Sequence, residues 1–289
     1  MNDLQKTELE ILKELIEICN RHSLIYYLVC GSALGAVKYG GFIPWDDDID
    51  VAMPRDDYER FLSCAAEELP AWCFLQNART EPLFCLLGSK LRDSRTTMVE
   101  KMFGALDINH GVFIDLFPLD GRPENGAALK KLTRRRNRFE AARRVRLEYS
   151  RFSGRNLLSF RCNLYYLLFH GFGLFADTGK EVKRYEDELR RWRLDDSKLW
   201  CNYANSISNS EYAPREQYGD GTWALFEGLR VRVPADADSY LTQKYGDWRA
   251  DLPLEEQKGH HRCEILDLEH PYTDYRFPYH RCSEQPGHF

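Results

Sequence analysis

The sequence GFIPWDDDIDVAMP, residues 41–54, decides how the rest of the chain is interpreted. Four of the five residues from 46 to 50 are carboxylates, namely Asp46, Asp47, Asp48 and Asp50. Apolar residues follow directly after them. Like charges this close repel one another and raise one another's pKa, so a folded protein needs a cation or a basic partner among them. The neighbouring residues indicate which of the two it is.

The acidic run is expected to open a strand over residues 46–52. Side chains alternate along a strand, so Asp46, Asp48 and Asp50 would share one face while Ile49 and Val51 face the core. Carboxylates on an open face are the hard oxygen ligands that Mg²⁺ or Mn²⁺ prefers. We therefore expect Asp48 and Asp50 to bind a metal, whereas Asp47 is expected to lie in a solvated turn.

A third carboxylate stands in a second apolar run, GVFIDLFPLD, residues 111–120. Its centre is Asp115, whose apolar neighbours predict that it is the most buried of the three acids. An unpaired buried carboxylate is costly, so Asp115 needs an arginine, a lysine or a metal beside it. A structural ion pair is one explanation; beside an Asp-x-Asp strand, a role at the metal is the better one.

The segment before the acidic run has a strand, a glycine and a helix start in succession. An amphipathic helix is predicted over about residues 3–21, and Ile25–Val29 is a short β-rich run. Gly31 ends that run, and Ser32 is a good N-cap for a helix over Ala33–Lys38. Free N–H groups at such a helix start suit a phosphate, although an ordinary strand-to-helix turn has the same pattern.

Composition limits the class of protein. The 289 residues are 43% hydrophobic and 29% charged, which is typical of a globular protein, and a net charge of −5 gives no general case for nucleic acid. The nine cysteines are scattered and odd in number, which favours free thiols in a reducing compartment. The amino terminus has no apolar signal segment, so cytoplasm is the default expectation.

Positive charge gathers in one part of this acidic chain. Between Lys130 and Arg155 there are eleven Lys or Arg against two Glu, and an apolar stretch interrupted by Arg161, Asn163 and His170 follows. That stretch is too polar for a confident membrane span. We expect a helical hairpin that either packs on the core or lies on an anionic membrane or polymer.

Several other residues are candidates for substrate binding. Lys90 and Arg92 follow an apolar run and could hold a diphosphate, or else form a solvated strand end. Trp45, together with Tyr39 and Phe42, could form an aromatic box for a quaternary ammonium, although aromatic residues beside a strand more often belong to the core.

Four segments together resemble the LicD family of the polymerase-beta-like nucleotidyltransferase superfamily, which includes fukutin-type ribitol-phosphate transferases. They are Gly31-Ser32, AVKYGGFIPWDDDIDVAMPRDDYERF (36–61), GVFIDLFPLD (111–120) and VRVPADADSYLTQKYGDW (231–248). The resemblance covers both ends of the chain and fails only across about 122–198. It is specific for the family and not for the substrate.

The resemblance implies an α/β (α+β) fold: one domain, residues 1–289, with a mixed sheet flanked by helices and a basic helical insertion at about 122–198. It implies Gly31 and Ser32 at a phosphate, Asp48 and Asp50 at the metal, and Asp115 as a third metal ligand or the general base. LicD-like chains also carry basic residues after the YGDW block, here Lys258, His260 and His261.

The implied reaction transfers a phosphoalcohol from a CDP-activated donor to a hydroxyl of a glycan, teichoic acid or glycolipid such as lipopolysaccharide, and it releases CMP. Phosphocholine is the leading candidate for the transferred group. Ribitol phosphate, phosphoethanolamine and aminoethylphosphonate are the alternatives. We expect the insertion to recruit the acceptor, at the inner face of a membrane, and to take no part in donor chemistry.

Two rival classes use some of the same residues. A glycosyltransferase with an Asp-x-Asp metal site would leave Gly31-Ser32 and Asp115 unexplained. A non-catalytic binding module would have little reason to keep Asp48, Asp50 and Asp115 together.

Overall fold

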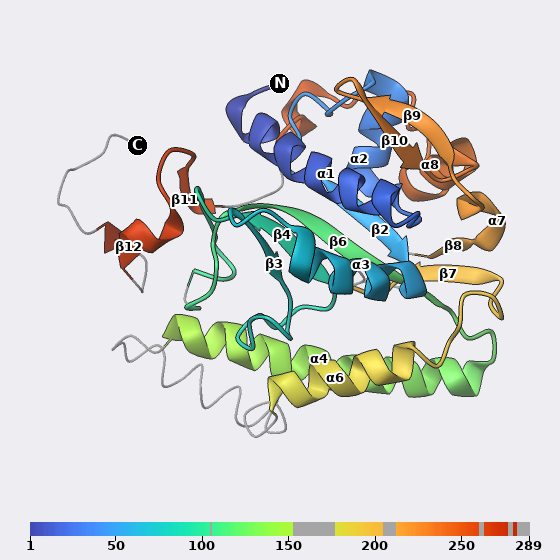
Figure 1. The fold of residues 1–289 in the computed structure, drawn as a ribbon. Coiled ribbons are helices and arrows are strands. Elements are labelled where there is room, and N and C mark those ends of the chain that lie inside the picture. Colours follow the sequence, from blue (N-terminus) through green and yellow to red (C-terminus); the bar gives the residue numbers. More distant parts are fainter. Residues whose placement is uncertain (105, 153–176, 205–211, 260–262, 277–279, 282–289) are drawn as a thin grey trace.

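A mixed sheet forms the centre of the computed structural model, which describes the chain except residues 105, 153–176, 205–211, 260–262, 277–279 and 282–289 (Figure 1). The strands, in sheet order, are β1 (Tyr27–Leu28), β2 (Asp50–Pro54), β6 (Val112–Gly121), β4 (Ser89–Asp93) and β3 (Cys73–Gln76). The far end of β6 also pairs with β7 (Leu199–Asn202), which pairs with β8 (Tyr212–Pro214). Only β2 and β6 run parallel among these pairs. The expected α/β fold with a mixed sheet is confirmed.

Helices cover both faces of this sheet. On one face lie α1 (Asp3–Arg21) and α3 (Arg55–Glu68), which contact β6 and each other. Near β1 lie α2 (Cys30–Leu34), the π-helical turn η1 (Gly35–Tyr39), α7 (Arg215–Tyr218) and α8 (Ala237–Tyr245). Smaller elements complete the chain: β9 (Thr222–Phe226) with β10 (Leu229–Val233), β5 (Thr97–Glu100) with β11 (Cys263–Asp267), β12 (Tyr275–Arg276) with β13 (His280–Arg281), η2 (Leu254–Glu256) and η3 (Tyr272–Asp274).

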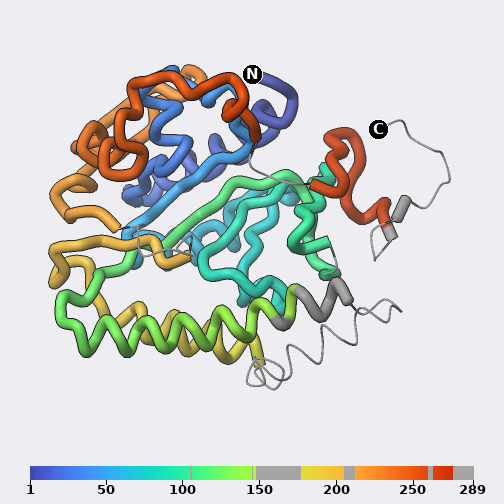
Figure 2. Tube along the Cα trace, turned by 180° about the vertical axis from the view of Figure 1, so that it is seen from behind, coloured from blue at the N-terminus to red at the C-terminus, as the bar shows by residue number. Residues whose placement is uncertain are grey.

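The insertion contains two long helices that lie side by side, α4 (Gly126–Phe152) and α6 (Thr178–Leu189) (Figure 2). Their shared apolar cluster includes Leu132, Phe139 and Tyr185 and reaches Leu87 on the core side. Of the expected helical hairpin, the basic stretch forms α4, which packs on the core together with α6. The interrupted apolar stretch, which was expected to form the other half of the hairpin, lies entirely outside the described residues. Within the described ranges, no helix is long and apolar enough to cross a membrane.

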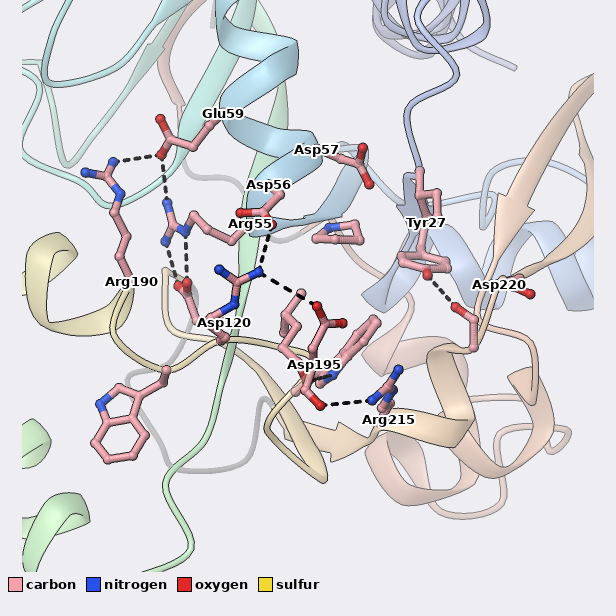
Figure 3. A pocket seen from close by; sticks show the side chains of 17 residues that line it. Tyr27, Arg55, Asp56, Asp57, Glu59, Asp120, Arg190, Asp195, Arg215 and Asp220 are labelled. Carbon is pink, nitrogen blue, oxygen red and sulfur yellow. Dashed lines mark hydrogen bonds and ion pairs between the residues drawn. The ribbon is translucent and has the colours of Figure 1, made fainter.

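A chain of ion pairs ties α6 to the end of the sheet (Figure 3). Arg55, at the start of α3, donates two hydrogen bonds to Asp120 of β6, at 2.8 and 2.6 Å, in a buried pair. Glu59, one turn further on, accepts from Arg190 at 2.7 Å, next to the end of α6. A pocket of about 470 Å³ opens beside these groups, at the C-terminal ends of β2 and β6. Arg55 and Arg190 are thus neutralised by Asp120 and Glu59.

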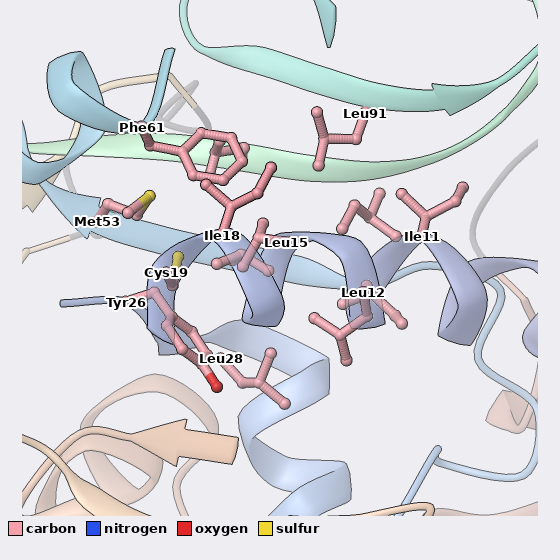
Figure 4. Packing of buried hydrophobic residues seen from close by; sticks show 14 of the residues in the cluster. Ile11, Leu12, Leu15, Ile18, Cys19, Tyr26, Leu28, Met53, Phe61 and Leu91 are labelled. Carbon is pink, nitrogen blue, oxygen red and sulfur yellow. The ribbon is translucent and has the colours of Figure 1, made fainter. Parts of the chain in front are cut away.

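Helix α1 supplies much of the core, and its predicted bounds are confirmed (Figure 4). Asn2 and Gln5 form a capping box at its start, which satisfies backbone N–H groups that have no partner within the helix. Ile11, Leu15 and Ile18 recur at helical spacing and are almost completely buried, with α1 packed on β4 and β6 and in one apolar cluster with residues of β2.

Two local predictions about the segment before β2 are wrong. The ladder begins at Asp50 and not at residue 46, because the chain turns at Pro44 and Trp45, with the Asp46 N–H donating to the Ile43 carbonyl. The helix begins at Cys30 rather than Ala33, because Cys30 adopts a positive φ of 53° that reverses the chain directly after β1. Ser32 therefore lies inside α2 and does not cap it.

Candidate functional site

Three charged side chains stand in one row across three neighbouring strands. The parallel pairing of β2 with β6 sets Asp50 opposite Asp115, and the antiparallel pairing of β4 with β6 sets Lys90 opposite Asp115. Directly paired residues point to the same face of a sheet, with strands about 4.8 Å apart. The structure thus brings Asp50 and Asp115 together, as the two apolar runs predicted.

Asp50 is the more deeply buried acid of this pair, at 8% exposure, whereas Asp115 is half-buried; the expectation that Asp115 would be the most buried is wrong. Ile49 and Val51, on either side of Asp50, pack in the core as expected. Burial raises the pKa of Asp50 well above its usual range, and the charges of Asp48 and Asp115 raise it further. A carboxyl in this environment favours a cation beside it.

The acidic loop brings three more carboxylates together just before β2. Asp46, Asp47 and Asp48 each offer a carboxylate oxygen within 4.8 Å of those of the other two. This oxygen-rich group fits a hard divalent cation, and Asp48 joins it to Asp50. Asp47 is half-buried against Gly259 instead of solvated, since a Cβ added to Gly259 would lie 2.5 Å from an Asp47 carboxylate oxygen.

Gly31 and Ser32 hold this acidic region in place. A Cβ at Gly31 would lie 2.6 Å from the Asp46 Oδ2, so only glycine lets the carboxylate approach so closely. The Ser32 hydroxyl is buried and accepts a hydrogen bond of 2.8 Å from the Asp50 N–H. Gly31 lines the pocket described next, whereas the Ser32 side chain positions the backbone at Asp50.

A pocket of about 380 Å³ opens over Asp48 and Asp50. Its walls carry aromatic rings and two lysines: Tyr39, Trp45, Tyr245, Trp248, Lys38 and Lys244. Lys244 lies close enough to Asp50 to oppose the rise in its pKa, and it hydrogen-bonds Cys30 Sγ at 3.1 Å. Lys38 binds Asp251 at 2.9 Å and the Ala250 carbonyl, which holds the loop after α8 over the pocket.

Lys90 and Arg92 belong to a buried ion-pair network. Lys90 Nζ lies 3.2 Å from Glu100 and 3.4 Å from an Asp115 oxygen. Arg92 is fully buried, with its guanidinium donating to Gln76, the Gly111 carbonyl and Glu100. Lys90 is thus brought to the acidic row, whereas Arg92 is not brought to a pocket and supports the fold beneath it.

The remaining predicted residues are placed in different ways. Trp45 lines the pocket and meets Tyr39 edge to face, with ring centroids 6.4 Å apart. Phe42 instead packs against Phe226 in the core, so the three rings form no box. Lys258 is exposed and directly precedes Gly259, the residue that lies against Asp47. His260 and His261 lie outside the described residues.

Sequence reasoning missed several groups at the site. Lys244, Tyr245 and Trp248 belong to a segment that was noticed only as a family signature, and nothing local links it to Asp50. Glu8 of α1 has a fully buried carboxylate whose oxygens hydrogen-bond no group that the structure describes. Burial raises the pKa of Glu8 well above its usual range, and Asp48 and Asp47 raise it further. The sequence did not indicate this role, because Glu8 lies among the apolar positions of α1 and its spacing is that of a core position.

Comparison with known proteins agrees with this geometry. Residues 23–157 match the family model described as LicD/FKTN/FKRP, nucleotidyltransferase domain, and this match contains the acidic row and loop. The chain is 27% identical over 276 residues to the lipopolysaccharide cholinephosphotransferase LicD of Haemophilus influenzae, covering 93% of this chain and 98% of that protein. Uncharacterized proteins of Rickettsia typhi and Rickettsia prowazekii are each 33% identical over short segments, 18% and 17% of this chain. Residues 23–157 therefore carry a nucleotidyltransferase domain of the LicD type, and the chain is similar over nearly its whole length to a LicD transferase.

Proposed function

We propose that this protein transfers phosphocholine from CDP-choline to a hydroxyl of lipopolysaccharide or a related cell-surface glycan or glycolipid, releases CMP, and requires Mg²⁺ or Mn²⁺. The observation that carries the proposal is that Asp48 and Asp50 line an aromatic pocket and that Asp50 is paired directly with Asp115 across β2 and β6. The near full-length similarity to the Haemophilus cholinephosphotransferase supports the choice of phosphocholine and of lipopolysaccharide.

The acidic residues fit a divalent ion, and Asp48 and Asp50 would hold it, with Asp115 beside them. Bound there, the ion would neutralise charge on the non-bridging oxygens of the donor phosphates. Ser32 fixes the backbone at Asp50, and the core positions of Ile49 and Val51 fix the strand on either side of it. The carboxylates therefore need little reorganisation when the donor binds, which is the main demand of phosphoryl transfer.

The pocket residues suit the nucleotide half of the donor. Trp45, Tyr39 and Trp248 provide rings on which a cytosine can stack, and Lys244 brings a positive charge close to Asp50, where the diphosphate would lie. In the reaction, the bond from phosphorus to the CMP oxygen breaks and a bond to the acceptor oxygen forms. Asp115 either takes the proton of the acceptor hydroxyl or acts as a further metal ligand.

Acceptor recruitment falls to the basic face of α4. Lys130, Arg134 and Arg138 are exposed and spaced four residues apart, so they form one stripe along the helix. A stripe of positive charge attracts an anionic glycolipid or polymer over roughly 8–10 Å at moderate salt.

The direct test is incubation of the purified protein and Mg²⁺ with CDP-choline or a panel of nucleotide sugars, with lipopolysaccharide as acceptor. Release of CMP with choline attached to the acceptor supports the proposal, whereas release of a nucleoside diphosphate from a nucleotide sugar would indicate a glycosyltransferase. Thermal unfolding gives a second readout: Mg²⁺ should stabilise the parent protein and do so less in Asp48→Asn. Binding of neither donor nor Mg²⁺ would favour a binding module.

A further inference from the structure

A second pocket lies on the other side of the Asp50 and Asp115 pair. Its volume is about 200 Å³, and Asp115, Lys90 and Glu100 form its wall toward the site. Pockets that hold whole small molecules commonly have about 300–1,000 Å³, so this one suits a head group and not a nucleotide or a glycan chain. We propose that it binds the trimethylammonium head of the transferred alcohol; this assignment rests on the proposed function.

The two pockets are close enough together for a single donor molecule to occupy both. Asp48 and Asp50 line the first pocket, Asp115 lines the second, and Asp50 and Asp115 are direct partners across β2 and β6. A phosphorus atom held at this pair has both pockets within the reach of its substituents. If the nucleotide extends into the first pocket, the second is open to the alcohol on the phosphorus that is transferred.

The walls of the second pocket match a quaternary ammonium. Four phenylalanine rings line it, those of Phe84, Phe103, Phe117 and Phe139, and all four are buried. Aromatic faces attract a cation, and a quaternary ammonium has no N–H group that must find an acceptor. The several hydroxyls of ribitol would lose hydrogen bonds to water against these rings, which is costly.

The charges at the pocket are compatible with a cation. Three carboxylates, Asp115, Glu100 and Glu140, stand against two cations, Lys90 and Arg143. Arg143 binds Glu140 at 2.7 Å, and Lys90 lies between Glu100 and Asp115. The carboxylates that line the pocket outnumber its lining cations by one, and Arg92, which binds Glu100 at 2.9 Å from behind, balances that charge. The pocket therefore carries no net positive charge that would repel a choline head.

One wall comes from the insertion. Phe139, Glu140 and Arg143 belong to α4, and the Phe139 ring packs on Tyr185 of α6 with centroids 5.6 Å apart. The insertion thereby takes part in donor selection, which replaces the expectation that it only recruits the acceptor.

The test compares CDP-choline with the CDP ester of 3,3-dimethylbutanol, a neutral isostere of choline, and with CDP-ethanolamine and CDP-ribitol. The rate of CMP release gives kcat/KM for the parent protein, Phe139→Leu and Glu140→Gln, with the exposed Glu216→Gln as a matched control. We expect the parent to prefer CDP-choline over the isostere about thirtyfold, which corresponds to the size of a desolvated cation–π contact. Each pocket variant should lose most of that preference, while Glu216→Gln keeps it.

Affinity for CMP, which lacks the alcohol, should be unchanged in Phe139→Leu and Glu140→Gln, and this separates a lost head-group contact from a damaged fold. Glu140→Gln keeps the size of the side chain, so it tests the pocket even if Phe139→Leu does not fold. An unchanged preference in the variants overturns the assignment while the proposed transfer stands. A parent that favours CDP-ribitol or CDP-ethanolamine overturns both the assignment and phosphocholine as the transferred group. If the parent releases CMP from none of the four donors, the proposed function and the assignment both fall.

Discussion

Replacing Asp50 by asparagine should separate the catalytic value of this carboxylate from its cost to the fold. Asp50 and Asp115 are direct partners on neighbouring strands. Two unit charges about 5 Å apart repel by roughly 3 kcal/mol at an effective dielectric constant of about 20. Lys90, 3.4 Å from an Asp115 oxygen, offsets part of this repulsion. We therefore expect Asp50→Asn to stabilise the metal-free protein by about 1–3 kcal/mol at pH 8.

The pH dependence has a definite sign. The pKa of Asp50 is raised in the folded protein, so the folded state binds more protons than the unfolded state above the ordinary Asp range. Stability is then lost as the pH rises through that window, and the advantage of Asp50→Asn should grow from pH 4 to pH 8. Urea unfolding of metal-free protein at several pH values measures this difference, with the exposed Asp196→Asn as the matched control.

The same substitution should remove turnover. Loss of one metal ligand is expected to cost about 4 kcal/mol of transition-state stabilisation, which is roughly a thousandfold in rate. CMP release at saturating Mg²⁺ and CDP-choline gives the rate directly. Activity within tenfold of the parent would refute the metal role of Asp50, and a less stable metal-free variant would refute the argument from repulsion.

Three further outcomes are expected. Burial, aided by the Arg92 charge, lowers the pKa of His110 to about 4, so the unfolded state binds more protons than the folded state between about pH 4 and pH 6.5. The free energy of unfolding should therefore fall by about 2 kcal/mol from pH 8 to pH 5 through this group. Thermal unfolding of His110→Gln should lack that pH dependence. Asp120→Ala leaves Arg55 buried without its bidentate partner and should cost about 3–5 kcal/mol in urea unfolding, which replacement of both residues by leucine should largely restore. The charge of the α4 stripe is reversed by Lys130→Glu, Arg134→Glu and Arg138→Glu. This change should weaken sedimentation with anionic vesicles at low salt at least tenfold and leave hydrolysis of CDP-choline unchanged. Equal vesicle binding would contradict the role of the stripe in recruitment.

The centre of the fold could be predicted because strong local patterns survive in the tertiary structure. Alternation in the two apolar runs predicts that Ile49 and Val51 face the core and that Asp50 and Asp115 face the opposite side of the sheet. Parallel pairing of the two strands then places the two carboxylates opposite each other. The start of β2 was harder, since a turn at Pro44 competes with the strand pattern of the acids that follow.

Partners from distant segments could not be predicted. A lysine and an arginine after an apolar run have the same local pattern whether they face a diphosphate or a buried acid. Glu100, which binds both Lys90 and Arg92, comes from β5, and only the folded chain shows that it lies there. Lys244 reaches Asp50 from α8, and the ring of Phe139 reaches the second pocket from α4, which contains none of the four sequence segments that resemble the family.

The wide separation of the site residues along the chain has a consequence for biosynthesis. β2 and β6 can pair as soon as β6 has emerged from the ribosome, which brings Asp50 and Asp115 together. Lys244 emerges roughly 130 residues later, some 6 to 26 seconds at typical elongation rates of about 5–20 residues per second. During that interval the nascent protein holds its acids without the lysine that later lies beside Asp50. Under the proposed metal binding, cellular Mg²⁺ would neutralise these acids during that interval and aid folding before any reaction takes place. The first pocket is complete only when α8 has docked.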